Sequence, residues 1–286
     1  MFLLALSACI TELPVFSDPC AEFPDPDVYK LTLDDGRSAL VELPDTVGPR
    51  PMVMMLHGYT GTGAKMRDVT RYGVVGAEEG FVSVFPNGYG TGLQTNRSWN
   101  AGDCCPPAIY ADSDDVGFLD RLVTTLEERV CADPERTYVS GFSNGAMMSL
   151  RMACQSQTVD GVFAAAGPLV TETCDTRPVP VMLAHGLEDR VVEFEGGVSP
   201  DGRLTYQSSD DTLAVFLARN NCQPDPRRVE VGRAMCEEYT CDVPVRRCTI
   251  PGWNHRWPGG MFTEAAGFNA TRQSWDFFDG VPLAAP

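Results

Sequence analysis

The residues best suited to chemistry lie between Tyr138 and Met147. The chain there reads Tyr-Val-Ser-Gly-Phe-Ser-Asn-Gly-Ala-Met, and residues 141–145 match Gly-x-Ser-x-Gly, a pattern typical of a nucleophilic serine on a sharp turn between a strand and a helix. The two glycines allow the strand and the helix to approach closely around the strained serine. Because so short a pattern also arises by chance, the prediction of Ser143 as a nucleophile for ester hydrolysis needs a base, an acid and oxyanion donors in suitable places.

A serine hydroxyl is a weak nucleophile and needs a base that takes its proton. The chain has 3 histidines, at 57, 185 and 255. In chains whose nucleophile stands on such a turn, the order is serine, acid, histidine. His57 precedes Ser143, and His185 ends the strand that we expect to carry the acid. His255 is therefore the predicted base.

The acid is expected after a strand that lies between the serine and the base. An apolar run at 179–184 leads into His-Gly-Leu-Glu-Asp-Arg, which places two carboxylates at the carboxyl end of the sheet, where catalytic residues collect. We predict that Asp189 orients His255, with Glu188 as the alternative. A loop carboxylate paired only with Arg190 is the other interpretation of Asp189.

Two backbone N–H groups are expected to stabilise the oxyanion. The first belongs to Asn144, directly after the nucleophile at the start of a helix. For the second we select Tyr59, in the glycine-rich loop 57–63 that follows an early strand. Such a loop can also bind phosphate, but its glycines match neither G-x-G-x-x-G nor the lysine-bearing phosphate loop. His57 is expected to shape this turn.

The flanking sequence contains the elements that must position these residues. Tyr29 to Leu43 predicts an antiparallel hairpin around a turn at 34–36. Apolar runs predict buried strands at 51–56, 81–85, 136–140, 163–166 and 179–185, and helices are expected at 113–130, 146–153, 210–220 and 271–278. This alternation predicts an α/β fold with a mostly parallel sheet and helices on both faces.

Composition limits the partners. The chain has 286 residues, is 43% hydrophobic and carries a formal net charge of −17. Such acidity argues against nucleic acids and anionic membrane surfaces, which require a cationic face. A neutral or weakly charged ester is the expected substrate.

The cysteine count and the N-terminus both indicate export. A count of 11 cysteines is high for a cytosolic enzyme of this size. Apolar residues 2–6 lead into Leu-Ser-Ala-Cys, which resembles a bacterial lipoprotein signal with Cys9 as the lipidated residue; a truncated secretory signal is the alternative. We expect an export signal and a Pro/Asp-rich linker in 1–27, and a single catalytic domain in 28–286. Contact with a membrane is expected only through a lipid on Cys9.

Without Cys9, the remaining cysteines are even in number and compatible with disulfides throughout. A zinc site in the C-terminal group is the alternative, although no C-x-x-C occurs there. The expected pairs are Cys154 with Cys174, Cys131 with Cys104 or Cys105, and Cys222, Cys236, Cys241 and Cys248 among themselves.

Several motifs together resemble one family. They are Leu-His-Gly-Tyr-Thr-Gly at 56–61, Asp-Asp-Val-Gly-Phe-Leu at 114–119, Gly-Phe-Ser-Asn-Gly at 141–145, His-Gly-Leu-Glu-Asp at 185–189 and Gly-Trp-Asn-His-Arg-Trp-Pro-Gly-Gly at 252–260. Over residues 28–280 the chain resembles the polyhydroxybutyrate depolymerase and feruloyl esterase-like family of secreted α/β-hydrolases. The resemblance implies Ser143, Asp189 and His255 as the triad, with Trp257 and Pro258 lining the ester pocket.

The chain departs from the family pattern close to the base. Trp253 and Asn254 stand where relatives have a glycine-rich run, and Arg256 follows His255. These bulkier residues bear on substrate preference rather than on the triad.

Trp99 lies in a long loop together with Cys104 and Cys105. If exposed, it could stack on an aromatic acyl group or a polymer chain. Equally, it could pack beneath a disulfide-linked loop.

The sequence as a whole predicts a secreted, monomeric serine esterase that needs no cofactor and no metal. Its expected substrates are feruloyl or acetyl esters of polysaccharide, or short-chain hydroxyalkanoate polyesters. A peptidase of the same fold and a catalytically inactive surface-binding module are the alternatives.

Overall fold

The computed structural model describes residues 10–23, 28–90, 96–199, 202, 204–261 and 267–280. Within them an 11-stranded sheet has the order β1-β2-β3-β5-β4-β8-β9-β10-β15-β14-β13. Its strands are β1 (Thr11–Glu12), β2 (Val28–Thr32), β3 (Ser38–Glu42), β4 (Arg50–Leu56), β5 (Val82–Pro86), β8 (Ala132–Phe142), β9 (Gly161–Ala165), β10 (Val181–Gly186), β13 (Arg227–Val231), β14 (Ala234–Tyr239) and β15 (Val245–Ile250). Two short pairs lie outside it: β6 (Tyr89–Gly90) with β7 (Arg97–Ser98), and β11 (Gly197–Val198) with β12 (Thr205–Tyr206).

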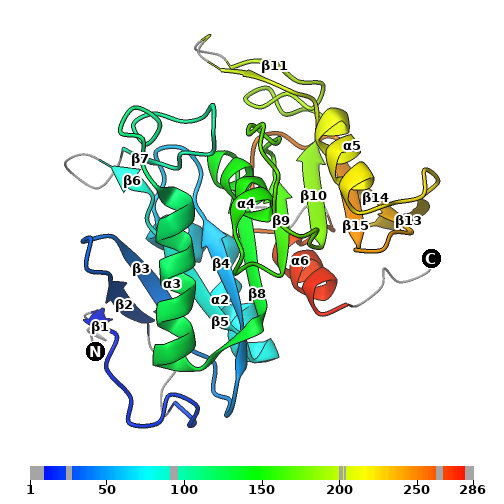
Figure 1. The fold of residues 1–286 in the computed structure, drawn as a ribbon. Coiled ribbons are helices and arrows are strands. Elements are labelled where there is room, and N and C mark those ends of the chain that lie inside the picture. The colour runs from blue at the N-terminus through cyan, green and yellow to red at the C-terminus, as the bar shows by residue number, and fades with distance from the viewer. Residues whose placement is uncertain are drawn as a thin grey trace, which may run out of the picture.

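The centre of the sheet, from β5 through β4, β8, β9 and β10 to β15, is parallel. Antiparallel hairpins extend it on both sides, β2–β3 beyond β5 and β13–β14 beyond β15. The carboxyl ends of β9 and β10 point toward the top of Figure 1. Because parallel strands share this polarity, the loops that follow them meet at one edge of the sheet.

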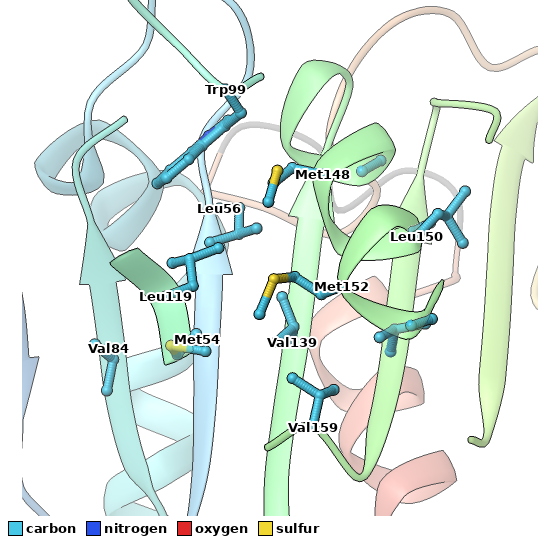
Figure 2. Packing of buried hydrophobic residues seen from close by; sticks show 14 of the residues in the cluster. Met54, Leu56, Val84, Trp99, Leu119, Val139, Met148, Leu150, Met152 and Val159 are labelled. Atoms are coloured by element: carbon cyan, nitrogen blue, oxygen red, sulfur yellow. The ribbon is translucent and has the colours of Figure 1, made fainter. Parts of the chain in front are cut away.

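Helices cover both faces of the sheet. They are α1 (Gly63–Thr70), α2 (Tyr72–Glu79), α3 (Asp115–Val130), α4 (Asn144–Gln155), α5 (Ser209–Arg219) and α6 (Ala270–Phe278). Side chains of β4 alternate between the faces, as a strand requires. Met54 and Leu56 pack in a cluster with residues of α3 and α4 (Figure 2), whereas Val53 and Met55 pack with residues of α1, α2 and α6. The mostly parallel α/β fold with helices on both faces is therefore confirmed.

The hairpin, the buried strands and the four helices expected from the sequence are all present within a few residues of their predicted bounds. Strand β15 and the antiparallel extension that β13 and β14 add to it were not predicted. Helices α1 and α2 were not located from the sequence either. No helix in the described part of the chain combines the length and apolar character that a membrane span requires.

The described residues contain five disulfides. They are Cys20–Cys131, Cys104–Cys105, Cys154–Cys174, Cys222–Cys241 and Cys236–Cys248. The Cys154–Cys174 pair and the pairing within the C-terminal group are confirmed.

The prediction for Cys131 was wrong, because it pairs with Cys20. Cys131 caps the carboxyl end of α3, whereas the loop that holds Cys104 and Cys105 contacts the amino end, where Asn100 N–H donates to Asp115 at 2.6 Å. A helix of 16 residues separates these ends by about 24 Å. No disulfide spans that distance.

Candidate active site

Ser143 occupies the turn between β8 and α4 in a backbone conformation with φ 56° and ψ −120°. A Cβ on Gly141 would lie 2.0 Å from the carbonyl oxygen of Gly145, and a Cβ on Gly145 would lie 2.3 Å from that of Leu56. Both positions therefore require glycine, because any side chain would collide with backbone atoms. The strand, turn and helix expected around the pentapeptide are present.

Ser143, His255 and Asp189 form a hydrogen-bonded chain. The Nε2 atom of His255 lies 2.9 Å from Ser143 Oγ, and its Nδ1 atom lies 2.6 Å from Asp189 Oδ2. A carboxylate only accepts hydrogen bonds, so Nδ1 carries the proton and Nε2 is free to accept one from the serine hydroxyl. The loops after β8, β10 and β15 bring these three side chains together.

Asp189 is held as a buried carboxylate. Its Oδ1 atom accepts hydrogen bonds from the N–H groups of Val191 at 2.9 Å and Val192 at 3.0 Å. Burial acts to raise the pKa of Asp189, but the neighbouring His185 imidazole and hydrogen bonds from His255 and from the Val192 N–H outweigh it and hold the pKa well below the ordinary value. Asp189 therefore stays ionised beside the histidine.

The alternatives for the acid find no support in this geometry. Glu188 is exposed, and among the described residues the ionisable partners within ion-pair distance of Asp189 are His185 and His255, not Arg190. The Nε2–H of His185 donates to the carbonyl oxygen of Val192 at 2.8 Å, which fixes the turn that carries Asp189.

A cavity of about 370 Å³ opens beside the nucleophile; we call it the Ser143 cavity. Ser143, Asn144 and Tyr59 all line it. The N–H of Asn144 is in the first turn of α4, where it has no partner within the helix. Within the described part of the chain, the N–H of Tyr59 donates no backbone hydrogen bond. Both predicted oxyanion donors therefore lie at the cavity that adjoins the nucleophile.

Comparison with known proteins identifies the family of this chain. A profile of the dienelactone hydrolase family matches residues 38–201. The chain belongs to this family. It is 28% identical to feruloyl esterase B of Piromyces equi over 79% of its own length, but it spans only 41% of that longer protein. It is 25% identical to a probable feruloyl esterase C of Aspergillus niger, covering 96% of both chains.

Solved structures show the same fold. An acetyl xylan esterase from Aspergillus awamori matches with a TM-score of 0.64 at 13% identity, over 88% of this chain and 99% of that one. Esterase PE8 matches with a TM-score of 0.56 at 18% identity, over 85% and 97%. The expected α/β-hydrolase fold is thus confirmed. The family match and the feruloyl esterase relatives confirm the resemblance to feruloyl esterases and the assignment as a carboxylic ester hydrolase. The likeness to polyhydroxybutyrate depolymerases stays a prediction.

Trp99 is fully buried, so the prediction that it contacts substrate was wrong. It packs inside the cluster of β4, α3 and α4, at the same end as Leu56 and Met148 (Figure 2). The alternative, burial beneath the disulfide-linked loop, is the one observed.

Trp99 instead joins the two segments that carry the predicted oxyanion donors. Its indole N–H donates to the carbonyl oxygen of His57 at 2.9 Å. Its backbone N–H donates to Asn144 Oδ1 at 2.8 Å, and Asn144 Nδ2 donates to its carbonyl oxygen at 3.0 Å. These buried hydrogen bonds fix the loop before Tyr59 relative to the start of α4. The sequence did not predict this role, because it depends on contacts between distant segments.

His57 has a structural role, as expected. Its Nδ1–H donates to the carbonyl oxygen of Gly58 at 2.8 Å, and its Nε2 accepts from the N–H of Gly88 at 2.9 Å. Burial lowers the pKa of His57 to about 4. The imidazole is therefore neutral and ties the turn after β4 to the segment after β5.

We expect this buried imidazole to make the stability pH-dependent. In the unfolded chain His57 binds a proton below about pH 6.5, whereas in the fold it does so only near pH 4. The contribution of the neutral His57 side chain to the free energy of unfolding is therefore fully present above pH 6.5 and is lost as the pH falls toward 4. We expect urea unfolding to show that the free energy of unfolding of the wild type falls between pH 7 and pH 4 by about 3 kcal/mol more than that of His57→Gln. Equal losses in the two proteins would contradict this assignment.

Two hollows adjoin His255 on the enzyme surface. The first, of about 520 Å³, is lined by Glu188, Arg190, Val191, Gly252, Asn254, His255 and Arg256. The second, of about 400 Å³, is lined by Lys65, Met66, Val69, Phe142, His255, Arg256, Trp257, Gly260 and Met261. Together we call them the His255 hollows.

Trp257 lines the second hollow, as the resemblance implied, although only 3% of it is exposed. Its indole N–H donates to Thr271 Oγ1 at 3.2 Å, which fixes the ring. Pro258 is buried and lines neither hollow nor the Ser143 cavity in the part of the chain that the structure describes. The prediction for Pro258 as a substrate contact therefore has no support.

The sequence missed several residues of the Ser143 cavity. Its walls include Cys104, Cys105, Ile109, Met147, Leu204 and Tyr206. Met147 could have been found, because it lies one helical turn after Ser143 on α4. Among the described residues no group of three or more histidines, cysteines or carboxylates is placed to hold a metal ion.

Proposed function

We propose that this chain is a serine carboxylic ester hydrolase in which Ser143 is the nucleophile, His255 the general base and acid, and Asp189 the residue that orients the imidazole. One observation carries the proposal: the unbroken path from Ser143 Oγ through His255 at 2.9 Å to Asp189 at 2.6 Å. The strained backbone of the serine and the neighbouring cavity support it.

The reaction follows from these positions. Ser143 Oγ attacks the ester carbonyl carbon while its proton moves to His255 Nε2. The carbonyl oxygen becomes an oxyanion and accepts hydrogen bonds from the backbone N–H groups of Asn144 and Tyr59. His255 then returns the proton to the leaving alcohol oxygen, which leaves an acyl-enzyme. A water molecule, activated by the same histidine, releases the acid and restores the serine.

The Ser143 cavity is proposed to receive the acyl group. The oxyanion donors line it and His255 does not, so the carbonyl carbon and its substituent belong on this side. Its apolar walls and volume of about 370 Å³ suit an aromatic acyl group. Relatives named feruloyl esterases support feruloyl esters as substrates. Acetyl esters of polysaccharide and short-chain hydroxyalkanoate polyesters are the other proposed classes.

We also propose that the protein is an exported monomer with one catalytic domain in 28–286. The disulfides support an oxidising compartment, since such bonds rarely persist in the cytosol. The proposed lipidation site, Cys9, lies outside the described residues.

A panel of substrates tests the function. It contains p-nitrophenyl acetate, butyrate and octanoate, methyl ferulate, a hydroxybutyrate polymer film and a peptide, and a fluorophosphonate probe is used in parallel. We expect hydrolysis of the small esters, no peptide cleavage, and labelling of the wild type but not of Ser143→Ala. A folded wild type that neither labels nor hydrolyses any ester would instead indicate an inactive module.

A further inference from the structure

The leaving alcohol must lie beside His255 during catalysis. Under the proposed mechanism, Nε2 of His255 delivers its proton to the alcohol oxygen, so that oxygen comes within hydrogen-bond distance of the imidazole. Because the acyl group occupies the Ser143 cavity, the rest of the alcohol extends over the His255 hollows. Their chemistry therefore bears on the alcohol that the enzyme accepts.

The His255 hollows are cationic although the protein is strongly acidic. Arg190 and Arg256 line the first, and Lys65 and Arg256 line the second, whereas Glu188 is the one acidic residue among the described lining residues. The chain as a whole carries a net charge of −17. A local excess of positive charge beside the base thus contrasts with the rest of the chain.

These cations have no evident structural task. Within the described residues no ion pair joins Arg190, Arg256 or Lys65 to a carboxylate, and all three side chains are exposed. Several other arginines of the described residues do form ion pairs, as Arg247 does with Glu237 at 2.6 Å. Lys65 lies in the first turn of α1, where the helix dipole disfavours a positive charge. Its position is therefore not explained by stability of the helix.

Arg256 is central to this arrangement. It is the cation that lines both hollows, and it directly follows His255 in the chain. Its carbonyl oxygen accepts a hydrogen bond from the indole N–H of Trp253 at 3.0 Å, which constrains the backbone from which its side chain extends.

We propose that the His255 hollows form a subsite for an alcohol that carries a carboxylate, with Arg256 as its main contact and Arg190 and Lys65 as supporting charges. This inference rests on the proposed function. The carboxylate could belong to a uronic acid sugar or to the carboxyl end of a hydroxyalkanoate oligomer. The overall negative charge opposes the approach of long anionic polymers, but salt screens it beyond about 10 Å, so that the nearby cations dominate at the site.

Matched substrate pairs test this subsite. One pair is an O-acetylated methyl glucuronoside as the free acid and as its uncharged amide; the other is the dimer of 3-hydroxybutyrate as the free acid and as its amide. The readout is the ratio of kcat/KM for acid over amide, which cancels effects common to both. We expect a preference for the acid of about fivefold or more at an ionic strength of about 0.1 M in at least one pair, and its loss at about 1 M salt. The pair that shows it identifies the source of the carboxylate.

Variants identify the residues. Arg256→Gln is expected to lower the acid preference about threefold, and Arg190→Gln/Arg256→Gln to abolish it. Arg136→Gln is the matched control, because it removes the same charge at the opposite end of β8, about 20 Å from Phe142, and should leave the ratio unchanged. Equal rates for acid and amide in the wild type, or a ratio that Arg256→Gln does not alter, would overturn the proposal.

A binding measurement separates this inference from the proposed function. Calorimetry with Ser143→Ala and the unesterified methyl glucuronoside, or 3-hydroxybutyrate, requires no turnover. Binding that weakens at high salt and in Ser143→Ala/Arg256→Gln would support the subsite even in an inactive enzyme. Hydrolysis of neutral esters without any such binding or acid preference would refute the subsite and leave the esterase proposal intact.

Discussion

Replacing Ser143 with alanine is expected to lower kcat for p-nitrophenyl acetate by about 10⁵-fold. The acyl-enzyme cannot form without Oγ, so only substrate binding and the oxyanion donors would remain to accelerate attack by water. The backbone at this position, with φ 56° and ψ −120°, is held by the surrounding strand and helix and not by the hydroxyl. We therefore expect the fold to be unchanged.

Steady-state kinetics and thermal unfolding check the two parts of this prediction. The midpoint of unfolding should stay within a few degrees of that of the wild type. A variant that folds normally and retains more than about one hundredth of the wild-type kcat would show that another group attacks the ester.

The catalytic residues could be predicted because local patterns and chain order constrain them strongly. Gly141 and Gly145 mark the turn, since a Cβ at either position collides with backbone atoms. His255 followed from the order of residues along the chain. Of the three histidines, His57 precedes the nucleophile and His185 precedes the expected acid, so only His255 follows both. Asp189 followed from its place after a buried strand. Each inference depended on a few neighbouring residues.

The remaining features depend on contacts between distant segments. Strands β14 and β15 carry adjacent charged residues, a pattern more typical of a loop, but Glu237 pairs with Arg247 at 2.6 Å and Glu238 with Arg246 at 2.5 Å across the hairpin. The burial of Trp99 likewise results from partners on three other segments. Cys131 was misassigned because sequence alone does not show which end of a long helix lies near which cysteine.

The geometry around Asp189 leads to a second large effect, on replacement by asparagine. The carboxylate accepts on both sides: Oδ1 from the N–H groups of Val191 and Val192, and Oδ2 from His255. An amide has one oxygen and one NH₂ group. If its oxygen faces the two backbone N–H groups, its NH₂ faces His255 and favours the tautomer with the proton on Nε2. That tautomer cannot accept the proton of Ser143.

We therefore expect Asp189→Asn to lower kcat by about 10⁴-fold, with a much smaller change in KM, because the substrate does not touch this buried residue. Glu188→Gln is the matched control, since it makes the same change at the adjacent, exposed carboxylate, and it should retain most of the turnover of p-nitrophenyl acetate. A large loss in Glu188→Gln and a small one in Asp189→Asn would reverse the assignment of the acid.

Since the pKa of Asp189 is held well below its ordinary value, its protonation should not contribute to any loss of wild-type activity above about pH 4. Profiles of kcat/KM against pH, measured down to pH 4 for the wild type and for Asp189→Asn, test this. If protonation of Asp189 caused a loss of activity, the wild type would show that loss and the residual activity of Asp189→Asn would not, which would contradict the prediction.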